Sequence, residues 1–272
     1  MRRIAFYVSD STGITAHTMG KSLLAQFESL DVEHITVPFV DSAEKVQAVI
    51  ERINKATDEQ GVPALVFSTL VNDELRHQLA QSRGFTMDIL DTFLKPLEQV
   101  LNVQSSYTIG RARGDATDDS YKNRINAVNY ALDNDDGSRL NQYEGADVIL
   151  VGVSRCGKTP TCLYLALQFG VFAANYPITE EDIDELLLPK ALQAHKQRLF
   201  GLTIDPERLT SIRNERRPNS KYASARQCEL EVREAEAMFR RYSIPFLDTT
   251  HFSVEEISTR IIAQLNINRQ RQ

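Results

Sequence analysis

The chain has few features that suit an oxidising compartment. Its three cysteines, Cys156, Cys162 and Cys228, form no Cys-x-x-Cys pair. Three cysteines cannot all pair within one chain, so a disulfide framework is not expected, and zinc and redox motifs have no support. The apolar run near the N-terminus covers only residues 4–8, which is too short for a signal peptide. We therefore expect reduced thiols and a cytoplasmic location.

A continuous apolar span and an excess of basic residues are also missing. Residues 159–179 carry no charge, but Gly170, Asn175 and Pro177 interrupt them, which predicts a helix followed by a strand and no membrane crossing. The chain has 31 Lys and Arg against 37 Asp and Glu, a formal net charge of −6. With the basic residues spread along the chain, nucleic-acid binding is not expected.

What the sequence does contain is the alternation of an α/β protein. Its 272 residues suffice for about two domains. In the first hundred residues, short apolar runs predict strands at 4–8, 34–40 and 64–68, and helical spacing predicts helices at 14–27, 43–53 and 73–81. This order predicts a parallel sheet covered by helices, which we assign to a Rossmann-like N-terminal domain over residues 1–105.

The alternation returns after a polar connecting segment, residues 106–145, within which 118–132 has helical spacing. The predicted strands are 146–151, 171–175, 199–204 and 244–247, and the predicted helices are 160–169, 206–213, 223–242 and 254–265. We assign residues 146–272 to a second α/β domain, with a P-loop kinase-like fold because of the motif that follows its first strand.

That motif is a phosphate-binding loop (P-loop), G-x-x-x-x-G-K-[ST], matched at every fixed position. The octapeptide is Gly152-Val153-Ser154-Arg155-Cys156-Gly157-Lys158-Thr159. Glycine at both ends lets backbone N–H groups turn inward around a phosphate, and the helix start adds the positive end of its dipole. Lys158 would supply a cation for the terminal phosphate, and the Thr159 hydroxyl is placed to bind Mg²⁺. The plain alternative is a glycine-rich turn with a surface lysine.

Two aspartates are candidates for metal binding or proton transfer. Asp205 follows the strand 199–204 and could hold Mg²⁺ or accept the proton of an attacking hydroxyl. It equally suits the N-cap of a helix that begins at Pro206. Asp10 is the alternative base, in a strand-to-helix loop, residues 9–13, whose side chains are also ordinary helix caps.

Seven basic residues are available for contacts with phosphates or with an acidic partner, although each also suits a solvated helix face. They are Arg113, Lys122, Arg124, Arg213, Arg216, Arg217 and Lys221. The triplet Gly20-Lys21-Ser22 imitates the end of a P-loop, but it lies inside a predicted helix and lacks the earlier glycine, so we reject it. The H-R-D and D-F-G motifs of conventional protein kinases are missing from the sequence.

Five segments together resemble the bacterial family of phosphoenolpyruvate synthase regulatory proteins and pyruvate, phosphate dikinase regulatory proteins. They are Ser9–Gly13, Asp135-Asp136-Gly137, Gly152–Thr161, Ala174–Pro177 and Gly201–Leu209, and the likeness covers residues 4–265. Cys156, where the dikinase regulators more often have threonine, favours the synthase branch.

The resemblance implies a bifunctional enzyme. In one direction it would be a serine/threonine kinase that uses ADP, inactivating phosphoenolpyruvate synthase at a threonine. In the other it would be a phosphorylase in which inorganic phosphate attacks the phosphothreonine and pyrophosphate is released. The implied cofactors are ADP, inorganic phosphate and Mg²⁺, and the implied partner is phosphoenolpyruvate synthase. A dikinase target and a homodimer stay open, and the residues alone also fit a P-loop small-molecule kinase or a non-catalytic nucleotide sensor.

Overall fold

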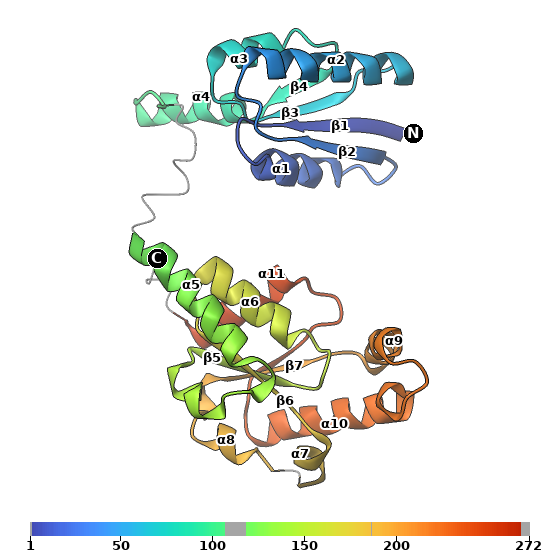
Figure 1. The fold of residues 1–272 in the computed structure, drawn as a ribbon, viewed down its shortest axis with the longest axis vertical. Coiled ribbons are helices and arrows are strands. Elements are labelled where there is room, and N and C mark those ends of the chain that lie inside the picture. The colour runs from blue at the N-terminus through green and yellow to red at the C-terminus, as the bar shows by residue number, and fades with distance from the viewer. Residues whose placement is uncertain (1, 107–117, 186, 268–272) are drawn as a thin grey trace. The chain divides into compact units, whose positions relative to one another are not determined.

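The computed structural model describes residues 2–106, 118–185 and 187–267, and the chain divides into two compact units, residues 1–115 and 116–272 (Figure 1). Each unit contains a four-stranded parallel sheet, which confirms the predicted fold of two α/β domains. The segment 116–145, which the sequence assigned to a connection, is part of the second unit, because α5 (Asp118–Asp133) packs along α6 (Lys158–Phe169).

The first unit has the strand order β2-β1-β3-β4, with all pairs parallel. Its elements are β1 (Arg2–Val8), α1 (Ile14–Leu24), β2 (Asp31–Val37), α2 (Ala43–Gln60), β3 (Leu65–Ser68), α3 (Asp73–Leu79), β4 (Phe85–Asp88) and α4 (Ile89–Leu101). Side chains alternate along β1, so Phe6 and Val8 pack in the core beneath α2 and α3, and Tyr7 packs in the core formed with α1 and α4.

Strand β4 and helix α4 were not predicted from the sequence. Strand β4 has four residues, none of them fully buried, and α4 contains Pro96, which weakens a helical pattern. The rejected triplet does lie inside α1, where Gly20 serves packing. A Cβ at Gly20 would come 2.5 Å from the Tyr7 ring and 2.8 Å from the Phe67 ring, so the glycine lets α1 approach the sheet closely.

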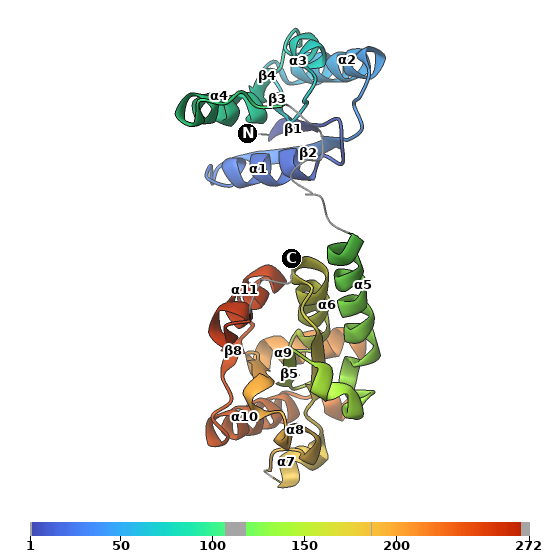
Figure 2. The same ribbon diagram turned by 90° about the vertical axis from the view of Figure 1, so that its left-hand side faces the viewer.

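The second unit has the strand order β6-β5-β7-β8, again parallel throughout. Its strands are β5 (Val148–Gly152), β6 (Ala173–Pro177), β7 (Leu199–Thr203) and β8 (Phe246–Asp248). Its other helices are α7 (Glu180–Glu185), α8 (Lys190–Gln193), α9 (Pro206–Arg216), α10 (Ala225–Arg241) and α11 (Val254–Leu265), and its short 3₁₀ turns are η2 (Asp135–Gly137), η3 (Leu140–Gly145), η4 (Lys196–Arg198) and η5 (Lys221–Ala223). Helices α5, α6 and α11 lie together on one face of the sheet, and α9 and α10 lie on the other (Figures 1 and 2).

The strand order reverses between β5 and β7, and ligands of open α/β sheets bind at the carboxyl ends of strands at such a switch point. The uncharged segment 159–179 is a helix and a strand, as predicted: Gly170 ends α6 in the left-handed conformation, at φ 64°, and β6 follows. Among the described residues, no helix has the length and apolar character needed to traverse a bilayer.

Candidate phosphate-binding site

The loop between β5 and α6 has the backbone that its two glycines predict. A Cβ on Gly152 would lie 2.3 Å from the backbone oxygen of Leu202, so only glycine permits this approach of β5 to β7. Gly157 has φ 93°, in the left-handed region, and it begins α6 without a side-chain cap. The first N–H groups of α6 therefore have no side-chain acceptor at the N-cap and can bind an anion.

Side-chain donors hold the P-loop through hydrogen bonds to its backbone carbonyl oxygens. Lys158 Nζ donates to the Val153 oxygen at 2.9 Å, and the Thr249 hydroxyl donates to the Cys156 oxygen at 3.1 Å. Arg213 Nη2 donates to the Ser154 oxygen at 3.1 Å. Three carbonyl groups are thus engaged by the protein, which fixes the loop in a curled conformation.

Arg213 is fully buried and belongs to an ion pair beneath the loop. Its Nη2 lies 2.6 Å from Glu231 Oε2, Nη1 donates to the Tyr222 oxygen at 3.0 Å, and the guanidinium carbon lies 4.2 Å from the centre of the Tyr222 ring. Burial by itself lowers the pKa of Arg213, but the hydrogen bond and charge of Glu231 raise it, leaving this pKa above its ordinary value. Arg213 therefore stays charged and joins α9, α10 and the loop.

Two carboxylates lie beside the start of α6. The Thr159 hydroxyl donates to Asp135 Oδ1 at 2.8 Å, and Asn175 Nδ2 on β6 donates to the same oxygen at 2.5 Å. The side-chain oxygen of Asn175 in turn accepts from the backbone N–H of Asp136 at 3.0 Å. Asn175 is fully buried, so β6 sets the position of both aspartates.

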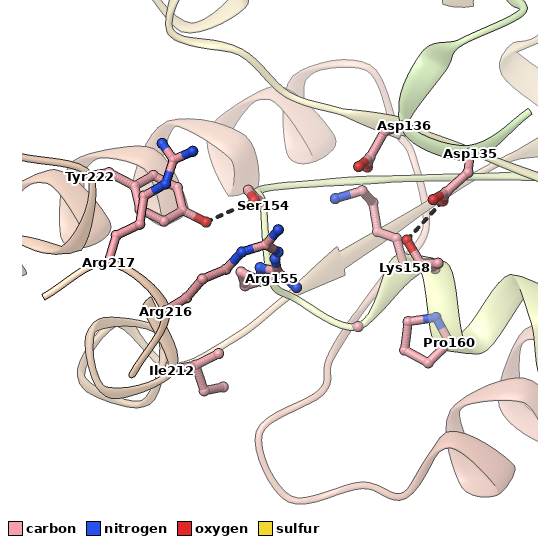
Figure 3. A pocket seen from close by; sticks show the side chains of 12 residues that line it. Asp135, Asp136, Ser154, Arg155, Lys158, Pro160, Ile212, Arg216, Arg217 and Tyr222 are labelled. Carbon is pink, nitrogen blue, oxygen red and sulfur yellow. Dashed lines mark hydrogen bonds between the residues drawn. The ribbon is translucent and has the colours of Figure 1, made fainter. Parts of the chain in front are cut away.

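These groups line one cleft of about 780 Å³ (Figure 3). Its lining residues are Asp135, Asp136, Ser154, Arg155, Gly157, Lys158, Thr159, Pro160, Ile212, Arg216, Arg217 and Tyr222. Of the eight P-loop residues, five line the cleft, whereas Gly152, Val153 and Cys156 are buried behind it. Burial raises the pKa of the Cys156 thiol, so this side chain is an inert neutral group in the loop.

The two aspartates named from the sequence lie elsewhere. Asp205 caps α9, with Oδ1 accepting from the N–H groups of Glu207 and Arg208 at 3.0 and 2.9 Å, and it does not line the cleft. Asp10 belongs to the first unit, where its carboxylate accepts from the Val71 N–H at 2.8 Å. Their proposed chemical roles stay predictions.

Asp135 and Asp136 were not predicted as site residues from the sequence. The only signal was the segment Asp135-Asp136-Gly137, used there for the family resemblance. These residues follow a helix, not a strand, and they reach the cleft through contacts of η2 with β6. A search for acids at strand ends therefore passes over them.

The seven basic residues named from the sequence lie in different places, and only some of them line the cleft. Arg216 and Arg217 line the cleft, Arg213 is buried beneath it, and Lys221 pairs with Glu180 at 3.3 Å. Lys122 and Arg124 lie on α5 and do not line the cleft. The remaining candidate, residue 113, lies outside the described residues.

An α/β fold with a lysine, a hydroxyl and two carboxylates at one loop–helix junction fits a phosphotransferase. The chain belongs to the kinase/pyrophosphorylase family, whose sequence model matches residues 5–262.

A relative from Pseudomonas fluorescens (strain Pf0-1), named "Putative phosphoenolpyruvate synthase regulatory protein", is 57% identical over 269 residues, which cover 99% of both chains. The protein of the same name from Pseudomonas aeruginosa (strain LESB58) is 56% identical over 269 residues, or 99% of this chain and 98% of its own. The family resemblance is confirmed over nearly the whole sequence.

Proposed function

We propose that this protein is a bifunctional regulator of phosphoenolpyruvate synthase. It transfers the β-phosphoryl group of ADP to a threonine of the synthase, and it uses inorganic phosphate to remove that group as pyrophosphate. The family supports phosphoryl transfer, and the names of the relatives support the target. The observation that carries the proposal is the junction at which Lys158, Thr159 and Asp135 meet in one cleft.

In this proposal, the loop and the start of α6 bind the phosphates of ADP. The N–H groups at the start of α6 and the helix dipole attract negative charge, and the Lys158 ammonium lies within the loop, 2.9 Å from the Val153 oxygen. Lys158 is only 4% exposed, so its charge acts on the phosphates with little screening by water.

The donor set beside the loop fits Mg²⁺, which prefers oxygen ligands. The Thr159 hydroxyl and the Asp135 carboxylate would hold the ion, and Asn175 keeps the carboxylate oriented. When bound, Mg²⁺ neutralises charge on the transferring phosphoryl group. With two ligands from the protein, Mg²⁺ would take its other ligands from phosphates and water.

Asp136 is our candidate for proton transfer, because it lines the same cleft and Asn175 holds its backbone. In the kinase direction, the threonine oxygen bonds to the β-phosphorus, the bond from that phosphorus to the oxygen of AMP breaks, and the carboxylate takes the hydroxyl proton. In the phosphorylase direction, a phosphate oxygen bonds to the phosphorus of phosphothreonine and the bond from that phosphorus to the threonine oxygen breaks. Pyrophosphate is released, and the threonine oxygen takes a proton from the protonated carboxyl group. Asp205 and Asp10 are the alternatives.

The test is to incubate the protein with phosphoenolpyruvate synthase and ADP labelled at the β-phosphate. We expect label on a synthase threonine and, after phosphate is added, label in pyrophosphate. Transfer to a metabolite without the synthase would indicate a small-molecule kinase, and ADP binding without any transfer would indicate a nucleotide sensor. Labelling of pyruvate, phosphate dikinase in place of the synthase would change the target.

Variants test the roles of individual residues. Lys158→Ala should lose both activities, whereas Lys21→Ala, which alters the P-loop-like triplet inside α1, should keep them. Full phosphorylase activity in a kinase-dead Lys158→Ala protein would refute a shared loop. Removing the base should cost about 10²–10⁴-fold in rate, so comparing Asp136→Asn with Asp205→Asn decides between these carboxylates.

A further inference from the structure

The cleft has walls of opposite charge. Asp135 and Asp136 lie at the end beside Thr159, and three arginines, Arg155, Arg216 and Arg217, lie at the other end with Tyr222 (Figure 3). We call these three side chains the arginine wall. They come from two elements, since Arg155 is in the P-loop, Arg216 ends α9 and Arg217 is the C-cap of that helix.

Arg155 occupies a conformation that non-glycine residues rarely adopt. Its φ is 77°, in the left-handed region, where a side chain costs conformational free energy. The G-x-x-x-x-G-K-[ST] pattern leaves this position free, so the loop motif does not require an arginine there. Figure 3 shows the side chain of Arg216 extending from α9 toward Arg155. Strained backbone residues cluster at functional sites, so the strained backbone of Arg155, together with the approach of Arg216, indicates a ligand-binding site.

The arginine wall has no acidic partner in the part of the chain that the structure describes. Ion pairs are present close by, between Arg213 and Glu231 and between Lys221 and Glu180, but none involves Arg155, Arg216 or Arg217. Guanidinium groups that face one another repel, and an anion between them turns this repulsion into attraction. The C-terminal end of a helix also attracts basic residues through its dipole, which applies to Arg216 and Arg217 at the end of α9. Arg155 is in the P-loop, so the dipole of α9 does not explain an arginine at that position.

The two sides of the wall are held in a defined arrangement. Arg213, one turn before Arg216 on α9, donates to the Ser154 oxygen of the loop at 3.1 Å. The Tyr222 hydroxyl lies 2.9 Å from Ser154 Oγ. Because these contacts flank Arg155 and Arg216, the helix end and the loop keep their spacing, which suits recognition of a small rigid anion.

We infer that the arginine wall is a second phosphate subsite, apart from the backbone N–H groups at the start of α6, for a phosphate dianion that is either free or carried on a side chain. Arginine binds phosphate oxygens in a bidentate manner, and several arginines together match the charge of a dianion. The inference rests on the proposed function in one respect: the phosphorylase direction brings together two phosphates from different molecules, so one of them needs a site that the loop does not supply.

Calorimetric titration with inorganic phosphate tests this inference on the full chain. The titration is done twice, without nucleotide and with an ADP analogue bound to the P-loop. In this analogue a methylene group replaces the oxygen between the α- and β-phosphorus atoms, so that no transfer occurs. We expect the wild-type protein to bind two phosphates per chain, and one when the analogue is present. In Arg216→Gln/Arg217→Gln the affinity of the wall site for phosphate should fall on the order of tenfold or more. At the same phosphate concentration, this variant should then bind one phosphate without the analogue and none with it.

The control is Arg233→Gln, which removes an exposed arginine of the same unit that does not line the cleft and should behave as wild type. A phosphothreonine peptide that displaces phosphate from the analogue-loaded protein, when its unphosphorylated form does not, would assign the wall to a phosphate ester. Displacement by neither peptide would assign it to free phosphate.

The inference is overturned if the analogue-loaded wild type binds no phosphate, or if the double variant matches the wild type. An analogue that fails to bind would contradict the proposed function instead. The comparison of wild type with the double variant in free phosphate would then still decide whether the wall is a subsite.

Discussion

Arg213→Leu should strongly destabilise the second unit. The substitution removes a fully buried guanidinium and leaves Glu231, whose side chain is only 9% exposed, without its ionic partner. Removing one member of a buried ion pair costs about 3–5 kcal/mol, because a charge is left buried without compensation. Among the described residues, the Glu231 carboxylate accepts one other side-chain hydrogen bond, from Gln227 Nε2 at 3.1 Å, which does not replace a positive charge.

The matched double variant separates the ion pair from the hydrogen bonds to the backbone. Arg213→Leu/Glu231→Leu removes both charges, so the buried-charge cost disappears. The oxygens of Ser154 and Tyr222 still lose their donor, and we expect a residual cost of about 1–3 kcal/mol. The double variant should therefore be more stable than Arg213→Leu alone. Arg233→Leu, which breaks an exposed pair with Glu234, should cost about 0–1 kcal/mol.

Urea denaturation followed by far-UV circular dichroism measures these free energies, and the chain has no tryptophan for a fluorescence signal. Two transitions should be fitted, because each unit has its own core. A cost below about 1 kcal/mol for Arg213→Leu would show that water reaches Glu231, and the reasoning from burial would fail. Costs that simply add in the double variant would show that the two residues are not coupled.

Two further predictions follow from close packing and from buried phenols. Gly152→Ala should cost about 1–3 kcal/mol or more and abolish ADP binding in calorimetry, because the new Cβ would overlap the Leu202 oxygen; Gly145→Ala, whose Cβ would lie 3.4 Å from the nearest atom, is the control and should be tolerated. Burial raises the pKa of Tyr7 and Tyr176 to about 12, so absorbance titration should show tyrosines that ionise later in the folded than in the unfolded protein. Since the folded pKa is the higher one, this stability is fully present below the ordinary value of 10.0 and is lost as pH rises toward 12. Identical titration curves with and without urea would contradict that prediction.

The P-loop could be located from the sequence because its requirements are local. Gly152 permits a close approach and Gly157 adopts a left-handed φ, and both needs appear as fixed residues at fixed spacing. The alternation of strands and helices was predictable for a similar reason, since apolar periodicity reflects which face of each element is buried. Strand β4 lacked that signal, because it has four residues and none is fully buried. Helix α4 has apolar residues at helical spacing but contains Pro96, and neither element was predicted.

The partners of the loop could not be predicted, because they lie far from it in the sequence. Asp135 lies 24 residues before Thr159, and Asn175 of β6 holds it there. Arg213 and Glu231 are both charged helix residues of a kind that usually faces solvent, yet they form a buried pair under the loop.

The sequence by itself therefore determined the class of fold, the loop and the family, because each depends on short-range patterns. The tertiary structure decided which carboxylates, arginines and hydroxyls surround the loop. That choice depends on how α9, α10 and η2 pack around the sheet, and the packing is set by contacts between residues far apart in the chain.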